Sequence, residues 1–495
     1  MTPAEKQIIA LDVAGSSGGP NRSHVASRYR CQTYRCSRLS PWPRLDRPAL
    51  LLCVVLLVRP INGAAQSSVK TCGPPSYCAR TDRRVEPYPA APPALGPAGS
   101  IITDPTFGSR IARVTDGATD ARHSGASFNA SASAEQNTWN TDSTRFIIGE
   151  RSGGIWLYDF NPISMTIRKT GKLKVPWRGT AQFSYRQRNL LYAVSARNPV
   201  FQEYDTASER LTTVHNPSSC FALQPSDWSA GISVSADDSR MISVFGPQQD
   251  RNYLLYVYDR RLGCRWYNTQ TGEIGGQWGP KGRITDSRRF TIHDAHISKS
   301  GEFVEISGGG KGPTFWQLDT MNVTLCANKA DHCLGHHAMG YSHLLNSPNR
   351  VHPLEFVVRP LNNLSAIKPL LGPMPPLIGW YDYHVSWNYA NSQDDTPACF
   401  STYRPGNPNS PGTPLLVNGP WENEIDCVET DGKGSTVWRF AHTYSTARNG
   451  FWSTPRGNVS QDGRFFMFTS DWQDQLGLGP KGKQYRTDVF IVELR

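Results

Sequence analysis

The sequence lacks the signatures of several large protein classes. Its main apolar run, residues 49–58, has only ten residues and is too short to cross a membrane. It has no Gly-x-Ser-x-Gly nucleophile elbow, no Walker phosphate loop and no paired CxxC spacing for zinc. Few long stretches show helical periodicity. A serine hydrolase of the elbow type, a P-loop enzyme and a zinc ribbon are therefore not expected.

The chain also has little excess charge outside its N-terminal stretch. Residues 1–65 hold 9 Lys and Arg against 3 Asp and Glu, a net charge of +6. The remaining residues hold 43 against 38, which leaves +5 over some 430 residues. This positive charge is too small for a surface that binds a phosphate backbone, and no run of basic residues with interleaved aromatics occurs. Nucleic acid is not expected as a partner.

Glycine, proline and tryptophan are abundant, at 43, 37 and 14 residues. Many short apolar runs separated by turns rich in glycine and proline indicate an all-β sandwich, barrel or propeller.

The N-terminal part is expected to lie outside the folded domain. Arg44 and Arg47 precede the apolar run at 49–58, and small residues near Ala65 follow it. This order is typical of a secretory signal peptide, although a buried strand is the alternative. We therefore predict an N-terminal extension and signal peptide at 1–65 and export to the periplasm or the extracellular space. Seven prolines between residues 73 and 99 predict an extended linker at 66–100, before a folded domain at 101–495.

Cysteine number supports export, because an even set remains after the signal segment. Spacing in the sequence suggests four disulfides, with zinc as the rival interpretation. The expected pairs are Cys72 with Cys78, Cys220 with Cys264, Cys326 with Cys333, and Cys399 with Cys427.

A repeated unit gives the strongest fold signal. Each copy has a polar turn, an apolar strand and then an aromatic-rich strand that ends near an aspartate. The turns centre on residues 142, 187, 238, 300 and 462, which are 45, 51, 62 and 162 residues apart. A period near 40–50 residues is typical of propeller blades, and the long gap has room for two or three more. The sequence predicts an all-β propeller of seven blades, with a β-sandwich as the alternative, and ring closure by the strand at 111–114.

The clearest copy contains Ser460-Gln461-Asp462-Gly463 before an apolar strand, with Asp-Gly as a tight hairpin turn. This unit resembles the TolB-like, WD-related propeller repeat of exported bacterial proteins. Residues 443–472 are also similar to part of the oligogalacturonate lyases. That resemblance implies a seven-bladed propeller that cleaves pectic oligomers by β-elimination with a manganese ion held by His and Gln. The family has a His-x-His pair just before this turn, whereas residues 453–458 here contain no histidine.

Histidine is concentrated in the second half of the chain, and neutral imidazole is a common ligand of transition metals. His296 and His384 each stand two residues before the serine of a blade's first strand, so they could converge at the channel mouth. For each residue the alternative is an ordinary polar or packing role. The predicted ligands of a divalent metal, Mn or Zn, are His293, His296, His336 and His384. The predicted ligand-binding residues are His337, Trp387, Glu422, Glu424 and Arg456.

Two functions are compatible with these residues. The first is a non-catalytic propeller whose axial face binds a saccharide or a protein partner. The alternative is a metal-assisted lyase or hydrolase of uronate-containing oligosaccharides, in which a His or Tyr removes a proton and an arginine such as Arg456 or Arg448 holds a carboxylate. Neither needs a membrane span after removal of the signal.

Overall fold

The structure is a computed structural model. It describes residues 72–196, 198–224, 227–229, 231–248, 251–285, 289–308, 312–326, 333, 336–347, 355–371, 382–389, 391–403, 419–431, 436–448, 450–479, 482 and 484–495. These residues belong to one compact unit, Val69–Arg495. The predicted signal segment at 1–65 lies outside the described residues. No described helix is long and apolar enough to cross a membrane.

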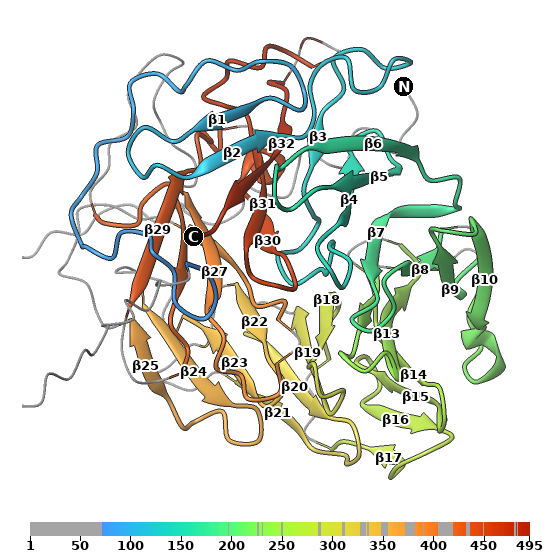
Figure 1. Ribbon diagram of the computed structural model, residues 1–495. Helices are drawn as coiled ribbons and strands as arrows, with labels where there is room; N and C mark the ends of the chain where they lie inside the picture. The colour runs from blue at the N-terminus through green and yellow to red at the C-terminus, as the bar shows by residue number, and fades with distance from the viewer. Residues whose placement is uncertain are drawn as a thin grey trace, which may run out of the picture. The chain divides into compact units, whose positions relative to one another are not determined.

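The described residues form seven antiparallel sheets, which we number in chain order (Figure 1). Sheet 1 contains β3 (Phe128–Asn129), β4 (Arg145–Glu150), β5 (Ile155–Phe160) and β6 (Ile167–Lys172). Sheet 2 contains β7 (Trp177–Phe183), β8 (Leu190–Ser195), β9 (Phe201–Asp205) and β10 (Arg210–His215). Sheet 3 contains β11 (Trp228–Ser229), β12 (Ser233–Val234), β13 (Arg240–Gly246), β14 (Leu254–Asp259), β15 (Gly263–Asn268), β16 (Glu273–Gly276) and β17 (Gly282–Arg283).

The remaining four sheets have the same antiparallel pattern. Sheet 4 contains β18 (Ile292–Ile297), β19 (Phe303–Gly308), β20 (Thr314–Gln317) and β21 (Val323–Leu325). Sheet 5 contains β22 (His337–Met339), β23 (His343–Asn346), β24 (Phe356–Pro360) and β25 (Lys368–Leu371). Sheet 6 contains β26 (Asp382–Ser386), β27 (Ala398–Tyr403), β28 (Glu424–Val428) and β29 (Val437–His442). Sheet 7 contains β30 (Gly457–Val459), β31 (Phe465–Ser470) and β32 (Asp488–Glu493), extended by β2 (Arg110–Arg113) and β1 (Ile101–Thr103). The helices described are two short 3-10 turns, η2 (Pro217–Ser219) and η3 (Gly450–Ser453).

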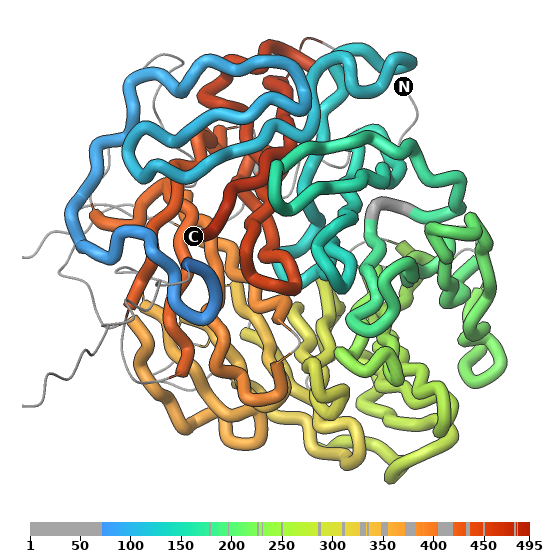
Figure 2. The backbone as a smooth tube through the Cα atoms, in the orientation of Figure 1, coloured from blue at the N-terminus to red at the C-terminus, as the bar shows by residue number. Residues whose placement is uncertain are grey.

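The sheets are arranged as a β-propeller, which confirms the predicted fold class. Neighbouring sheets touch through their first strands: β12 contacts β18, β22 contacts β26, and β26 contacts β30. The strand predicted to close the ring does so, because β2 pairs with β32 and places Ile111 opposite Val492. The first strand of sheet 1, β3, contacts β31 and β32 of sheet 7. One sheet therefore combines strands from both ends of the domain, as the colours of Figure 2 show.

The predicted repeat corresponds to one hydrogen-bonded turn used several times. In sheet 7, the Ser460 Oγ donates to Asp462 Oδ1 (2.6 Å) and accepts from the Phe465 N–H (3.1 Å). In sheet 3, Ser235 Oγ donates to Asp237 Oδ1 (2.6 Å) and accepts from the Arg240 N–H (3.0 Å). The serine thus replaces a backbone partner and fixes where the second strand begins. This local chemistry is why the repeat is visible in the sequence.

Apolar side chains fill the spaces between neighbouring sheets. One buried cluster joins β4 and β5 of sheet 1 to β7 and β8 of sheet 2, around Leu157 and Phe183. A second joins sheets 7 and 1 around Trp139, Phe160 and Phe465, whose rings pack edge to face or stacked. Such burial is the main driving force that holds the sheets together.

All four predicted disulfides are present: Cys72–Cys78, Cys220–Cys264, Cys326–Cys333 and Cys399–Cys427. Cys399 and Cys427 lie directly opposite each other on β27 and β28, so this bond staples two strands of sheet 6.

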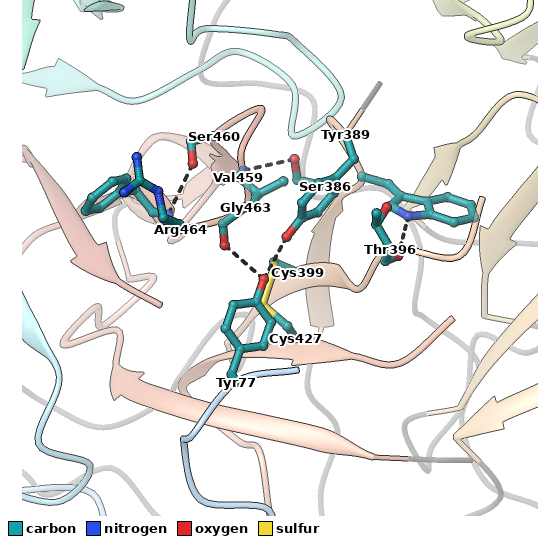
Figure 3. The surroundings of a disulfide bond; sticks show 12 residues. Tyr77, Ser386, Tyr389, Thr396, Cys399, Cys427, Val459, Ser460, Gly463 and Arg464 are labelled. Atoms are coloured by element: carbon teal, nitrogen blue, oxygen red, sulfur yellow. Dashed lines mark hydrogen bonds between the residues drawn. A yellow bond between two sulfur atoms is a disulfide. The ribbon is translucent and has the colours of Figure 1, made fainter. Parts of the chain in front are cut away.

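The segment before β1, expected as an extended linker, buries two tyrosines against the propeller. Tyr77 is 2% exposed, and its hydroxyl lies 2.6 Å from that of Tyr389 and donates to the Gly463 carbonyl (2.9 Å) (Figure 3). Gly463 has φ +70°, and a Cβ there would lie 1.9 Å from the Tyr389 hydroxyl. The best repeat turn is therefore also the place where the N-terminal segment joins sheets 6 and 7. We call residues 77–86 the N-terminal clasp.

Candidate functional site

The axial side of sheets 6 and 7 contains a buried arginine that has no counter-ion among the residues that the structure describes. Arg456 precedes β30, is fully buried, and donates from Nη1 to the Ala132 carbonyl (3.2 Å). In the part of the chain that the structure describes, its Nε and Nη2 have no hydrogen-bond partner. The ring of Phe451 in η3 covers one face of the guanidinium, with its centroid 3.6 Å from Cζ. The in-plane edge that bears Nε and Nη2 is the edge that binds carboxylates.

Other arginines in the same protein show how that edge is normally used. Arg439 donates from Nε and Nη2 to the two oxygens of Glu424 (2.8 and 2.6 Å). Arg110 binds the carboxylate of Glu493 in the same way, at 2.8 Å for both bonds. The free edge of Arg456 therefore has the geometry of a carboxylate site. Burial lowers the pKa of Arg456 to about 9, and the nearby Arg151 acts in the same direction, so the group remains a cation at neutral pH.

Two histidines and a tyrosine adjoin this arginine. The rings of His336 and His384 lie 4.0 Å apart between centroids, and the His384 ring stacks on Tyr403 at 5.3 Å. Burial, His336 and Arg456 together lower the pKa of His384 well below its ordinary value. His384 is therefore a neutral imidazole at physiological pH, and its Nε2 is buried without a hydrogen-bond partner among the described residues. A neutral buried imidazole is suited to accept a proton.

Asp382 lies beside the second histidine. Its Oδ1 lies 3.4 Å from Nδ1 of His336, and its Oδ2 accepts from the Tyr403 hydroxyl (3.3 Å). The His336 side chain is 41% exposed, so this side of the group reaches solvent. We call His336, Asp382, His384, Tyr403 and Arg456 the arginine–histidine group.

A second set of polar residues lies around the first strands of sheets 4 and 5. His337 Nε2 lies 2.9 Å from Glu135 Oε1 and 3.2 Å from Glu305 Oε2, and His296 Nε2 lies 3.2 Å from Asp294 Oδ2. The two histidine rings are 6.0 Å apart. Burial alone would lower both histidine pKa values, but the carboxylates raise the pKa of His296 to about 9 and that of His337 well above its ordinary value. In this carboxylate–histidine group the chain supplies its own counter-charges.

Below these groups a cavity of about 20 Å³ lies where the first strands converge, large enough for about one water molecule. Its lining includes Glu135, Gln182, Lys299 and Trp387 from four different sheets or their loops. Lys299 Nζ lies 5.6 Å from the ring centroid of Trp387, and burial lowers the pKa of Lys299 to about 7. The Trp387 indole donates to the Thr396 carbonyl (2.8 Å). The predicted ligand-binding Trp387 thus lines the channel instead of the arginine–histidine group.

The structure brings together only part of the predicted site. His336 lies against His384, which is near Arg456, and His296 lies with His337. His293 is exposed, because the pairing of β18 with β19 shifts register between Ile292 and Asp294. Glu422 and Glu424 are both buried, and Glu424 is bound to Arg439. Metal binding by His293, His296, His336 and His384 and ligand binding by the other five predicted residues stay predictions.

The donor sets do not fit a metal ion well. Among the described residues, the one group whose three ligand atoms lie within 4.8 Å of one another is Asp120, His123 and Glu150. There, Lys172 Nζ already lies 2.7 Å from Glu150 Oε2, which also accepts from the Trp156 indole (3.0 Å). The histidines form two pairs, and no third described ligand joins either pair within that distance. No chemical step is therefore assigned to a metal.

Sequence inspection did not single out several of these residues. Glu135 and Arg151 stand in loops of sheet 1, far along the chain from the groups that they join. Glu305 could have been noticed, because a lone carboxylate in the apolar strand β19 must find a partner. Arg456, Asp382 and Asp294 each stand four residues before the serine of a repeat turn, which puts them at similar levels of neighbouring sheets.

Comparison with known proteins supports the fold. Neither a family model nor a curated protein matches the sequence. An oligogalacturonate lyase solved in complex with manganese has a TM-score of 0.51 and 11% identity, over 82% of this chain and 98% of that one. The oligogalacturonate lyase of Vibrio parahaemolyticus has a TM-score of 0.51 and 9% identity, over 82% and 99%. The Pan2 WD40 domain of Neurospora crassa has a TM-score of 0.42 and 9% identity, over 73% and 89%. The two structures with a TM-score of 0.51 confirm the predicted remote resemblance to oligogalacturonate lyases, and at such identities it concerns the fold alone.

Proposed function

We propose that this protein binds a uronate-containing oligosaccharide at the arginine–histidine group and cleaves it by β-elimination. The main evidence is the edge of the Arg456 guanidinium that bears Nε and Nη2. It is fully buried and has no hydrogen-bond partner among the described residues. A buried cation without a counter-ion is unfavourable, and a ligand carboxylate would supply both the charge and two parallel hydrogen bonds.

The neighbouring residues suit the chemistry that follows carboxylate binding. The proton on the carbon next to a carboxylate becomes more acidic when a cation stabilises the charge that develops on the carboxylate oxygens. In the proposed reaction, that C5–H bond breaks and the proton passes to neutral His384. The electron pair forms the C4=C5 bond, the C4–O4 bond breaks, and O4 takes a proton from His336, which lies beside Asp382.

Two further facts support this proposal. Both structural neighbours with a TM-score of 0.51 are oligogalacturonate lyases, and this chain spans nearly their whole length. One of them is a manganese complex, but the present proposal uses no metal, because the described donor sets do not fit one. The four disulfides favour an oxidising compartment, so we also propose that the protein acts after export.

A binding protein without turnover is the second candidate, and the ligand could then be a saccharide or a protein partner. The observation that favours it is the position of Phe451, whose ring covers the guanidinium of Arg456. Among the described residues, the ring of η3 would have to move before a ligand reached this face of Arg456, and such a slow step suits tight binding more than rapid turnover.

The test is an ultraviolet assay for unsaturated products with oligogalacturonates, combined with calorimetric binding. We expect Arg456→Lys, which keeps a charge but loses the planar edge, to reduce binding by about tenfold or more. His384→Gln should abolish product formation and preserve binding. Arg261→Gln, at an exposed arginine in the turn after β14, is the matched control. Binding without product would leave the second candidate, and wild-type affinity in Arg456→Lys would refute both.

A further inference from the structure

A second arginine without a counter-ion lies beside the first. Arg151 follows β4 in sheet 1, and its backbone N–H donates to the Ser127 carbonyl (2.9 Å). Its guanidinium carbon lies 5.9 Å from the ring centroid of Trp452, and that of Arg456 lies 5.0 Å from the same ring. The two cations are therefore separated by no more than the sum of these distances.

We propose that Arg151 and Arg456, both held against Trp452, bind two neighbouring acid groups of one ligand, so that the protein selects an oligosaccharide with consecutive uronates over a single uronate. This inference rests on the proposed function of Arg456 and adds Arg151 as a specificity-determining residue.

No acid in the described part of the chain neutralises Arg151. Its guanidinium takes part in no hydrogen bond or ion pair there, apart from the contact with the Trp452 ring. The nearest acid in sequence, Glu150, is bound to Lys172 and to the Trp156 indole instead. Burial lowers the pKa of Arg151. Two like charges at one ring, both partly or wholly removed from water, repel each other, and a dianionic ligand would offset that repulsion.

Another tryptophan in the same protein shows that two stacked arginines need not form a ligand site. Arg240 and Arg265 have their guanidinium carbons 4.8 and 5.2 Å from the ring centroid of Trp278. The chain neutralises Arg240, whose Nε donates to Asp259 (2.8 Å). Arg265 Nη2 donates to the Thr320 carbonyl (2.9 Å), although its Nε has no partner among the described residues. At Trp452 the same stacking occurs, but neither guanidinium has a carboxylate partner among the described residues, and Arg456 has only the Ala132 carbonyl. The missing carboxylate, not the stacking, indicates an acidic ligand.

The two rings near these arginines have different roles in this arrangement. Phe451 is 47% exposed and covers the face of Arg456, whereas Trp452 lies against both guanidinium groups. Trp452 therefore acts as a spacer that fixes the separation of the two charges. A ligand with one acid group can neutralise only one of the two guanidinium groups. A neutral disaccharide can neutralise neither of them.

The experiment compares galacturonic acid, its 1,4-linked dimer and a neutral disaccharide by calorimetry on the full chain. We expect the wild type to bind the dimer about tenfold more tightly than the monomer, and the neutral sugar not measurably. Arg151→Gln should bring the dimer to the affinity of the monomer and leave the monomer unchanged. Arg456→Lys should weaken both acids, and Arg261→Gln should change neither.

The outcomes separate this inference from the proposed function. If Arg151→Gln retains the wild-type preference for the dimer while Arg456→Lys weakens both acids, the role of Arg151 is refuted and the carboxylate site at Arg456 stands. If the wild type binds neither acid, the proposed function fails, and the inference about Arg151 fails with it. Thermal unfolding of each variant shows whether a loss of binding reflects a loss of fold.

Discussion

Arg439 and Arg456 are both fully buried, yet the chain treats them in opposite ways. Arg439 in β29 binds both oxygens of Glu424, and its Nη1 donates to the Arg84 carbonyl (2.8 Å) and to Asp82 (3.1 Å) in the N-terminal clasp. Arg456 has one backbone acceptor, at Ala132, and two unused donors. The first arginine ties the clasp to sheet 6. Arg456 keeps two hydrogen-bond donors that no described residue uses. We therefore regard Arg439 as a structural cation and Arg456 as part of a binding site.

The charges around the two arginines differ as well. Asp426 lies next to Glu424, and burial together with Glu424 raises the pKa of Asp426 well above its ordinary value. One arginine there faces two carboxylates. At Arg456 the neighbouring charged group is another cation, Arg151. Arg439 therefore has an excess of acidic neighbours and Arg456 has a basic neighbour. This difference predicts different effects of mutation and pH at the two sites.

The largest expected difference is in stability. Arg439→Met would leave Glu424 buried and unpaired, and breaking a buried ion pair in this way costs about 3–5 kcal/mol. Arg456→Met removes a buried cation with one backbone acceptor and with Nε and Nη2 unpaired among the described residues, so the free energy of unfolding should stay the same or increase. Guanidinium denaturation under oxidising conditions measures both. Equal destabilisation by the two variants would contradict the distinction between them.

The second difference is in histidine ionisation. His296 has acids beside it and a pKa raised to about 9, whereas His384 has Arg456 beside it and a lowered pKa. Because the folded pKa of His296 exceeds its unfolded value of about 6.5, its contribution to stability is complete below pH 6.5. That contribution disappears as pH rises through about 9. It amounts to at most about 3 kcal/mol, from 1.36 kcal/mol per pKa unit.

The measurement is the free energy of unfolding at pH 6 and pH 10 for the wild type and for His296→Gln. The wild type should lose its advantage over the variant between these values. His384→Gln should show a smaller change of opposite sign, because folded His384 stays neutral and only its unfolded imidazole, with a pKa of about 6.5, is charged near pH 6. A parallel pH dependence for the two variants would show that the neighbouring charges do not control these histidines.

The sequence predicted the parts of this molecule that depend on local chemistry. The Ser460 turn, the four disulfides and the closing strand at 111–114 were all correct, because each follows from short-range hydrogen bonding, spacing or strand pattern. His384 was named because it stands two residues before the serine of a first strand, His336 because it lies in a glycine-flanked loop, and Arg456 because an arginine can hold a carboxylate.

The sequence did not predict which side chains would come together in the arginine–histidine group and in the carboxylate–histidine group. Arg151 meets Trp452 because the ring brings sheets 1 and 7 together, and Glu135 meets His337 because the loop of sheet 1 reaches sheet 5 at the axis. No local pattern records either contact. Glu424 was expected to bind a ligand, but it lies in the third strand of sheet 6 and is bound to Arg439. His293 was expected at the axis, but a register shift in β18 leaves it exposed. Side-chain direction at such points depends on register, which the sequence does not specify closely.

The smallest expected effect also tests the clasp against the axial site. Tyr77→Phe removes a hydroxyl that donates to the Gly463 carbonyl and contacts the Tyr389 hydroxyl, all in buried surroundings (Figure 3). The loss should reduce the free energy of unfolding by about 1–2 kcal/mol, the range for a buried polar group deprived of its partner. Saccharide binding should be unchanged, because this contact lies at the repeat turns of sheets 6 and 7, at the opposite ends of their first strands from Arg456. Tyr258→Phe, at a half-buried tyrosine whose hydroxyl has no hydrogen-bond partner among the described residues, is the matched control and should change stability less. A loss of uronate binding in Tyr77→Phe with its fold intact would mean that the clasp and the axial site are coupled, and that the division between a structural and a binding arginine is too simple.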